Sequence, residues 1–226
     1  MELIKGLGSL KGPLVAHFEK KDAAREKANR MTREIIRNCS RLIREAHDLG
    51  TNAALLKETK ARVTELKKAL RGYDELYYSG MVEGALQEFA EAMIFIAIIN
   101  DKPMPTPKGL GITENSFVLG IGDVIGELRR ETLLELRRHN IPKAYENLDK
   151  MECLYNLLMD FNIPGGLLQV RHKQDVARSL IEKTRGELII AEATQGLRLS
   201  INERTPETDS GEEGAQGEPE AGSKEY

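Results

Sequence analysis

The segment Met81–Ile99, MVEGALQEFAEAMIFIAII, constrains the fold more than any other part of the chain. It ends in eight consecutive apolar residues, Ala92–Ile99, and as a helix it would be apolar on nearly every side. Such a helix is normally buried in a core. It also carries Glu88 and Glu91, whose spacing places both carboxylates on one face, about one turn apart. Because two acids on a buried helix repel each other and lose solvation, we expect a compensating cation, either a divalent metal ion or an arginine from another helix.

A second acidic pair lies on a second largely apolar helix, predicted for Phe117–Arg130 with the sequence FVLGIGDVIGELRR. Asp123 and Glu127 are at positions i and i+4, so they share one face of that helix. If the two acidic helices pack together, the glutamates of the first helix and Asp123 can surround one cation, with Glu127 as an extra ligand or a support for the ligands. The alternative is that Glu127 pairs with Arg130 on a solvent-facing surface.

Three glycines interrupt the same helix, at Gly120, Gly122 and Gly126. A glycine inside a helix costs about 1 kcal/mol relative to alanine, so three of them need a reason. Close approach of a neighbouring helix or of a ligand is such a reason. The glycines therefore favour tight packing at the acidic face.

The composition favours an all-helical protein, because only 5% of the 226 residues are aromatic and few segments show the alternation typical of strands. The first sixteen residues contain three glycines and Pro13 and are predicted to be irregular. Three closely spaced prolines predict a loop over Asp101–Gly111. The expected helices run approximately over His17–Leu49, Asn52–Leu70, Tyr73 or Asp74 to Asn100, Thr113–His139, Lys143–Phe161 and Leu167 or Leu168 to Ser200. A bend is predicted at Gly80, inside the third of these helices.

Several functional classes are disfavoured by what the sequence lacks. No apolar run reaches the ~20 residues that span a bilayer, and no compact apolar segment of signal-peptide type begins the chain, so we expect a soluble, cytoplasmic protein without membrane partners. The two cysteines, Cys39 and Cys153, have no metal-binding or redox spacing and are predicted to lie in the core. There is no Glu-x-x-His motif of di-iron bundles and no glycine-rich phosphate loop.

The formal net charge of −3 hides an asymmetry between the body and the C-terminal end. Residues Glu203–Tyr226 hold eight acidic and two basic side chains, a net charge of −6, which leaves +3 for the rest of the chain. This end is rich in Gly, Glu, Pro and Ser and has no apolar periodicity. We therefore expect a helical domain over residues 1–202 and a disordered acidic tail over residues 203–226.

Arginines follow three-and-four spacing along the first long helix, on a stripe ~80° wide opposite its apolar face. Such a stripe can bind successive phosphates, which guanidinium groups contact in bidentate fashion. Alternatively, it is a solvated face partly balanced by Glu26, Glu34 and Glu45. The second helix is basic as well. The candidate nucleic-acid-binding residues are Arg30, Arg33, Arg37, Arg41, Arg44, Lys67, Lys68 and Arg71.

Three motifs resemble the translin family, and within it the translin-associated factor X branch. They are GYDELYYSGMVEGALQEFAEAMIF (Gly72–Phe95), SFVLGIGDVIGELRR (Ser116–Arg130) and RHKQDVARSLIEKTRGEL (Arg171–Leu188). The resemblance extends over nearly the whole body, to about Gly196. LQEFAEA is similar to the paired glutamates of the factor X branch, and GIGDVIGELRR is similar to its aspartate-bearing helix. The branch represented by translin itself lacks this full acidic set.

The resemblance implies an all-helical fold of about seven helices that assembles into a hollow octameric ring. It also implies an endoribonuclease that depends on Mg²⁺ or Mn²⁺, in which Glu88, Glu91 and Asp123 are the catalytic, metal-binding acids. Members of the family also form heteromers, so a second kind of subunit is an open alternative to a homo-oligomer. The chain departs from the family in its proline-rich loop, its acidic tail and a shorter connection between the two acidic helices.

Two other functions remain open from the sequence. One is a non-catalytic ring that binds single-stranded DNA or RNA, as translin-like proteins do. The other is a helical scaffold that binds no nucleic acid. The acids favour the enzyme over the binding ring, because uncovered carboxylates would weaken the binding of a phosphate backbone.

Overall fold

The computed structural model describes residues 6–48, 50 and 52–204, with side chains described through residue 198. In these ranges the regular elements are all helices, which confirms the predicted all-α class. The longest helices are α1 (Leu7–His47), α4 (Gly80–Ile99), α6 (Glu114–Arg137), α7 (Ile141–Met159) and α8 (Arg171–Arg204). The shorter helices are α2 (Ala53–Ala69), α3 (Asp74–Tyr77) and α5 (Pro107–Leu110).

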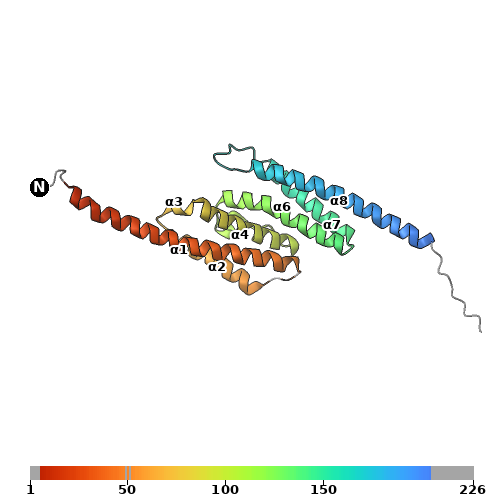
Figure 1. Ribbon diagram of the computed structural model, residues 1–226, viewed down its shortest axis with the longest axis horizontal. Helices are drawn as coiled ribbons and strands as arrows, with labels where there is room; N and C mark the ends of the chain where they lie inside the picture. Colours follow the sequence, from red (N-terminus) through yellow and green to blue (C-terminus); the bar gives the residue numbers. More distant parts are fainter. Residues whose placement is uncertain (1–5, 49, 51, 205–226) are drawn as a thin grey trace, which may run out of the picture.

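The helix α4 lies at the centre of the fold, between α1 on one side and α6 on the other (Figure 1). The helix α2 covers the outer side of α1, while α7 and α8 pack on α6 and on each other. The described ends of the chain lie at opposite ends of the molecule, because α1 and α8 both project beyond the central helices (Figure 1). No helix among the described residues is long and apolar enough to cross a membrane.

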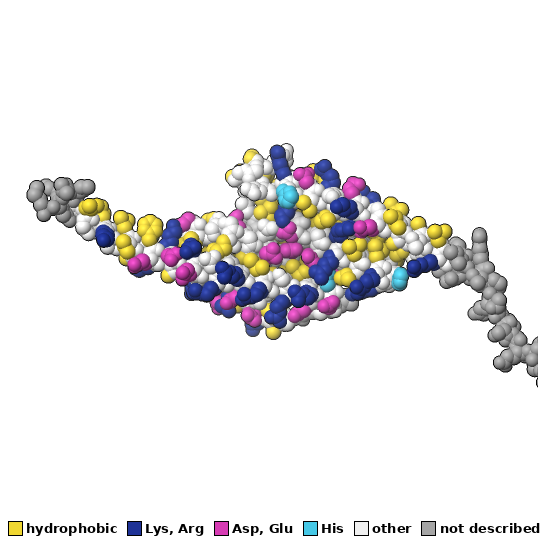
Figure 2. Space-filling model, in the orientation of Figure 1, with side chains coloured by type: hydrophobic (Ala, Val, Ile, Leu, Met, Phe, Trp, Pro, Cys, Tyr) yellow, Lys and Arg dark blue, Asp and Glu magenta, His cyan; other side chains and the backbone are white. Residues whose placement is uncertain are grey.

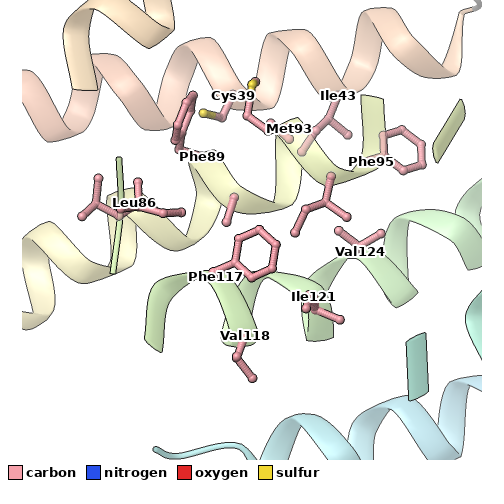
Figure 3. Close-up of a cluster of buried hydrophobic side chains, with 14 of the residues drawn as sticks. Cys39, Ile43, Leu86, Phe89, Met93, Phe95, Phe117, Val118, Ile121 and Val124 are labelled. Carbon is pink, nitrogen blue, oxygen red and sulfur yellow. The ribbon is translucent and has the colours of Figure 1, made fainter. Parts of the chain in front are cut away.

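The central position of α4 follows from its sequence. Its segment from Phe89 to Ala97 is buried throughout. Figure 3 shows Phe89 and Met93 directed toward α1 and its Cys39, while Phe117 and Ile121 approach from α6. An apolar helix can be covered on all sides only if it has neighbours on opposite faces, and α1 and α6 provide them.

Side-chain caps set several helix boundaries close to their predicted positions. Asn52 accepts a hydrogen bond from the Leu55 amide at 2.9 Å, and Thr113 accepts one from the Ser116 amide at 3.1 Å, which begin α2 and α6. Asn140 accepts a longer bond, 3.4 Å, from the Lys143 amide at the start of α7. The predicted boundaries of these helices are thus correct to within two residues at the N-terminal side.

The N-terminal boundary of α1 was predicted wrongly. The helix begins at Leu7 and continues through Pro13, so most of the segment expected to be irregular is helical. The apolar residues Leu7, Leu10, Leu14 and Phe18 recur at helical spacing, and this periodicity outweighs the helix-breaking residues. All four side chains are more than half exposed. This part of α1 therefore gains little from packing within its own chain.

Three further boundaries differ from prediction. The expected third helix is divided into α3 and α4, because Ser79 adopts an extended backbone and its hydroxyl donates to the Leu76 carbonyl. The third proline of the loop, Pro107, begins the single-turn helix α5, since proline is tolerated in the first turn of a helix. The last helix starts at Arg171, a few residues later than expected. The structure also corrects the placement of Cys153, which is exposed, whereas Cys39 is buried as predicted.

The tail predicted to be disordered, residues 203–226, lies outside the described residues except for its first two residues, which are the last two of α8.

The close approach of α6 to α4 depends on Gly120. A Cβ atom at this position would lie 2.7 Å from Ala90 Cβ, 3.0 Å from the Gln87 carbonyl oxygen and 3.1 Å from the Glu91 amide nitrogen. Such distances are too short for a side chain, so the glycine allows the two backbones to touch at the turn that carries Glu88 and Glu91. The prediction that the glycines of this helix serve close packing is confirmed at Gly120 but is wrong for Gly126, where a Cβ atom would meet nothing within 4 Å.

We expect Gly120→Ala to lower the stability of the protein, by about 1–3 kcal/mol, because the added methyl group overpacks the α4–α6 contact. Gly126→Ala is the matched control. A Cβ atom at Gly126 would meet nothing within 4 Å, so this change should raise stability by up to about 1 kcal/mol through helix propensity alone. Thermal unfolding at one protein concentration measures both, and equal midpoints would contradict the packing role of Gly120.

Candidate functional site

The four predicted acids line one open cleft with a volume of about 520 Å³. Its walls come from α1, α4, α6 and the first turn of α8. Figure 2 shows acidic side chains gathered near the middle of this face of the molecule, with a band of basic side chains beside them over α1. The lining residues are Ser40, Ile43, Arg44, Gln87, Glu88, Glu91, Asp123, Glu127, Arg130 and Lys173.

Gly120 explains why the two acidic faces meet. It touches α4 at the backbone of Gln87 and Glu91, and Asp123 and Glu127 follow it by one and two turns on the same side of α6. The backbone contact between the two helices, and not an interaction between the acidic side chains, therefore sets the relative positions of the acids.

Among the described residues, Glu88 and Glu91 have no counter-ion. Neither carboxylate makes a hydrogen bond or an ion pair with any residue in the described ranges, although the Glu91 residue is only 8% exposed. Burial, together with repulsion from Asp123 and Glu88, raises the pKa of Glu91 to about 8. Burial, followed by repulsion from Asp123, raises the pKa of Glu88 as well. The compensation expected for these two acids is thus not supplied by an arginine of the described chain.

Asp123 is held from two sides. Gln87 on α4 donates a hydrogen bond from Nε2 to Asp123 Oδ2 at 2.5 Å, and the Lys173 ammonium on α8 pairs with Oδ1. Both side chains of this ion pair are about three-quarters buried. Sequence reasoning did not identify Lys173, because its partner lies 50 residues away and only the packing of α8 on α6 brings them together.

Glu127 is bound mainly by a histidine and only weakly by its neighbour on α6. His47 Nε2 lies 2.7 Å from Glu127 Oε2, and His47 Nδ1 lies 2.6 Å from Glu131 Oε2. Arg130 reaches Glu127 at 3.7 Å, so the expected pairing on α6 exists but is the longer contact. The hydrogen bond from His47 lowers the pKa of Glu127 despite its partial burial. The contact with His47 therefore favours the ionised form of Glu127, in contrast to Glu88 and Glu91.

His47 was missed by sequence reasoning. It is only 2% exposed, and both ring nitrogens face carboxylates, an arrangement that requires two N–H donors and hence the protonated imidazolium. Burial lowers the pKa of His47, but the hydrogen bonds from its ring to Glu127 and Glu131 outweigh burial, so the pKa is raised overall. Its position at the end of the apolar stripe of α1 was the one available signal.

The predicted basic residues are all exposed, and none forms a hydrogen bond or ion pair within the described part of the chain. Glu34 pairs with Arg62 at 3.0 Å and so does not balance the stripe. Arg44 borders the acidic cleft. Arg30 and Lys68 line a groove between α1 and α2, and the end of α2 forms a neighbouring recess with Lys67, Lys68 and Arg71 beside two tyrosines. Arg33, Arg37 and Arg41 lie along α1 between these regions.

The donor set of the cleft fits a hard divalent cation in its chemistry. Four carboxylates line it, and two of them, the buried Glu91 and the partly buried Glu88, have no counter-ion among the described residues, which is the situation that a cation relieves. Within the described residues, no group of three or more His, Cys, Asp or Glu side chains is positioned to hold a metal ion as it stands. Lys173 and His47 draw Asp123 and Glu127 toward themselves, so binding would require these contacts to rearrange.

The raised pKa of Glu91 predicts a pH dependence of stability without divalent cations. The folded protein binds a proton at Glu91 up to about pH 8, whereas the unfolded chain releases it near pH 4.5. The contribution of protonated Glu91 is therefore fully present below pH 4.5 and is lost as the pH rises toward 8. Glu91→Gln should flatten this decline in the free energy of unfolding, which amounts to a few kcal/mol.

Urea unfolding in EDTA over this pH range measures the free energy of unfolding, with Glu83→Gln on the same helix as the control. Identical slopes for wild type and Glu91→Gln would contradict the prediction.

Comparisons with known proteins agree with this architecture. The translin family model matches residues 23–185. An uncharacterized protein of Methanocaldococcus jannaschii is 33% identical over 181 residues, which cover 78% of this chain and 80% of that protein. The fold is similar to crystal structures named apo-NeC3PO (TM-score 0.67, 24% identity, 84% of this chain and 100% of that chain) and AfC3PO (TM-score 0.66, 28% identity, 80% and 96%). A complex of AfC3PO with duplex RNA is similar at a TM-score of 0.65, with the same identity and coverage as AfC3PO. The chain belongs to the translin family.

Proposed function

We propose that the protein is a metal-dependent endoribonuclease that hydrolyses RNA phosphodiester bonds in the acidic cleft, as in the factor X branch of the family. The observation that carries the proposal is the meeting of four carboxylates from two helices in one cleft, of which the buried Glu91 and the partly buried Glu88 have no counter-ion among the described residues. The complex of the similar AfC3PO with duplex RNA supports RNA as the substrate.

The residues have distinct roles in this proposal. Glu88, Glu91 and Asp123 would hold Mg²⁺ or Mn²⁺, with Glu127 as a fourth ligand or as a support for the others. When bound, the cation supplies Lewis acidity at the scissile phosphate and acidifies a water molecule. Gln87 orients the Asp123 carboxylate through Oδ2, and the hydrogen bond from His47 favours the ionised form of Glu127. Neutralisation by the cation would favour the ionised forms of Glu88 and Glu91.

RNA binding is assigned to the unpaired basic surface. The arginines of α1 follow the helix axis beside the acidic cleft, and the basic end of α2 continues this surface. Guanidinium groups without internal partners can bind phosphates without first breaking an ion pair. Contacts of this kind are largely independent of sequence and weaken with salt.

We further propose that the protein assembles as a ring of identical subunits, an octamer by resemblance to the family. The exposed apolar side chains of the first turns of α1 are the structural support, since they project beyond the body and are left uncovered in one chain. Light scattering should give a mass several times the 25.3 kDa of one chain, and a monomer at micromolar concentration would refute the assembly.

A non-catalytic ring that binds single-stranded DNA or RNA is the second candidate. It is favoured by the contacts of Lys173 with Asp123 and of His47 with Glu127, which already neutralise two of the four acids without a metal ion. The two functions differ in their response to metal. The binding ring retains nucleic acid equally in Mg²⁺ and in EDTA, whereas the enzyme releases shortened RNA only in Mg²⁺.

The sharpest variant for catalysis is Glu88→Gln, because Glu88 makes no hydrogen bond or ion pair in the described structure that the substitution would break. We expect it to lower Mg²⁺-dependent RNA cleavage at least about 100-fold, with unchanged or tighter RNA binding, since a metal ligand and a negative charge are removed. Asp123→Asn, which also affects the contact with Lys173, should do the same. Labelled RNA incubated with Mg²⁺ or EDTA provides the measurement.

Glu83→Gln, five residues earlier on α4, is the control and should cleave like the wild type. Retained cleavage in Glu88→Gln at an unchanged melting temperature would refute the catalytic assignment.

The arginine stripe makes a separate prediction. Replacing Arg33, Arg37 and Arg41 with glutamine should weaken RNA binding and reduce the slope of log affinity against log salt by about 0.7–0.9 for each phosphate that these arginines no longer neutralise. The matched control replaces three exposed basic residues elsewhere, Arg137, Lys183 and Arg198, and so removes the same charge. If both triple variants bind equally, only the net charge matters and the stripe is a solvated face.

A further inference from the structure

The proposed function assigns no role to Lys173, although this lysine lies inside the acidic cleft. It lies in the first turn of α8 and reaches across to α6, where its ammonium group pairs with Asp123 inside the acidic cleft. Its side chain is 23% exposed, in contrast to Arg171 and His172, which are exposed. A lysine whose side chain is about three-quarters buried therefore lies among four carboxylates, at a place suited to a bound cation.

The stem of Lys173 lies directly against a glycine of α6. A Cβ atom at the buried Gly122 would lie 2.8 Å from Lys173 Cβ, 3.0 Å from Cγ and 3.1 Å from Cδ. The aliphatic stem thus runs directly along the α6 backbone, one residue before Asp123. Gly122 is the second glycine of this helix whose cost is explained by close approach, and here the approaching group is the lysine itself.

The charge of Lys173 acts on the whole cleft and not only on Asp123. It opposes the repulsion among the acids and counteracts the rise in the pKa of both Glu88 and Glu91. The two oxygens of Asp123 are already engaged, Oδ1 by Lys173 and Oδ2 by Gln87. A divalent cation that takes Asp123 as a ligand therefore meets a like charge at one of the carboxylate oxygens.

We propose that Lys173 is the internal cation of the acidic cleft: its ammonium group competes with the divalent cation for Asp123 and thereby sets the affinity of the cleft for metal. The inference rests on the proposed function, because it takes Asp123 to be a metal ligand. If a metal ion displaced it, the ammonium group would remain near the cleft, because its stem lies against Gly122, and could donate a hydrogen bond to a non-bridging oxygen of the RNA phosphate. Lys173 is thus a positioning residue in the metal-free protein and a phosphate contact in the loaded one.

Binding of Mn²⁺ to the full-length protein without RNA, followed by electron paramagnetic resonance, tests the competition directly. We expect Lys173→Met, which has a similar length and no charge, to bind Mn²⁺ about tenfold more tightly than the wild type, because the competing charge is removed. Lys173→Arg keeps the charge and should bind like the wild type. Lys183→Met removes an exposed lysine from the same helix and should also bind like the wild type.

A second measurement separates competition from a merely structural ion pair. RNA cleavage at saturating metal should fall about tenfold or more in kcat for Lys173→Met, with partial rescue in Lys173→Arg, although the methionine variant binds metal more tightly. Lys173→Gln removes the charge but retains a hydrogen-bond donor, and it should also bind Mn²⁺ more tightly than the wild type. If the methionine variant does not fold, the glutamine variant tests whether the charge of Lys173 competes with the metal ion.

The outcomes distinguish this inference from the proposed function. If the wild type and Lys183→Met bind Mn²⁺ and both neutral variants of Lys173 bind it no more tightly, the competition is refuted while the metal site stands. If the wild type binds no Mn²⁺, the metal-dependent function itself is refuted, and this inference with it.

Discussion

The backbone contact between α4 and α6 at Gly120 is the constraint on which the site depends. Because the two helices touch at the turn of Glu88 and Glu91, the acids of α6 one and two turns further lie along the same cleft. A side chain at this position would separate the helices and widen the cleft. The same contact buries the apolar faces of both helices, so the stability of the core and the geometry of the acids have a common origin.

The four acids divide into two kinds by their electrostatic surroundings. Asp123 and Glu127, both on α6, have partners from other helices, Lys173 and His47. Glu88 and Glu91 on α4 have none within the described residues, and their raised pKa values reflect the cost of burying them. Evenly paired acids would form a structural network of ion pairs. The uneven distribution of partners leaves part of the negative charge uncompensated, which is what favours a chemical role for this cleft.

The sequence predicted the elements more reliably than their contacts. The burial of α4, the acidic faces of two helices and the exposed basic face of α1 follow from periodicity within one segment, and the structure shows each of them. The partners of the acids could not be predicted in this way. His47 lies 80 residues before Glu127 and Lys173 lies 50 residues after Asp123, so both contacts depend on how helices distant in sequence pack. The start of α1 was predicted wrongly for a related reason. The glycines and the proline of this segment indicated an irregular structure, and the apolar side chains that recur there at helical spacing remain more than half exposed in the described chain.

The arrangement of charge also indicates how an acidic cleft could bind a negatively charged ligand such as RNA. Uncovered carboxylates repel a phosphate backbone, and burial strengthens the repulsion because fewer water molecules screen it. The unpaired arginines beside the cleft attract the same backbone, but they lie at the surface, where solvent and salt weaken them. For an RNA bound as proposed, attraction along the strand and repulsion at the cleft would therefore act on different phosphates. Only a cation between the carboxylates and the phosphate reverses the local repulsion, so the cleft would accept a phosphate closely when a cation is present and exclude it otherwise. If the protein is the proposed nuclease, the dependence of cleavage on metal would follow from the binding of the substrate as well as from the chemistry of the bond.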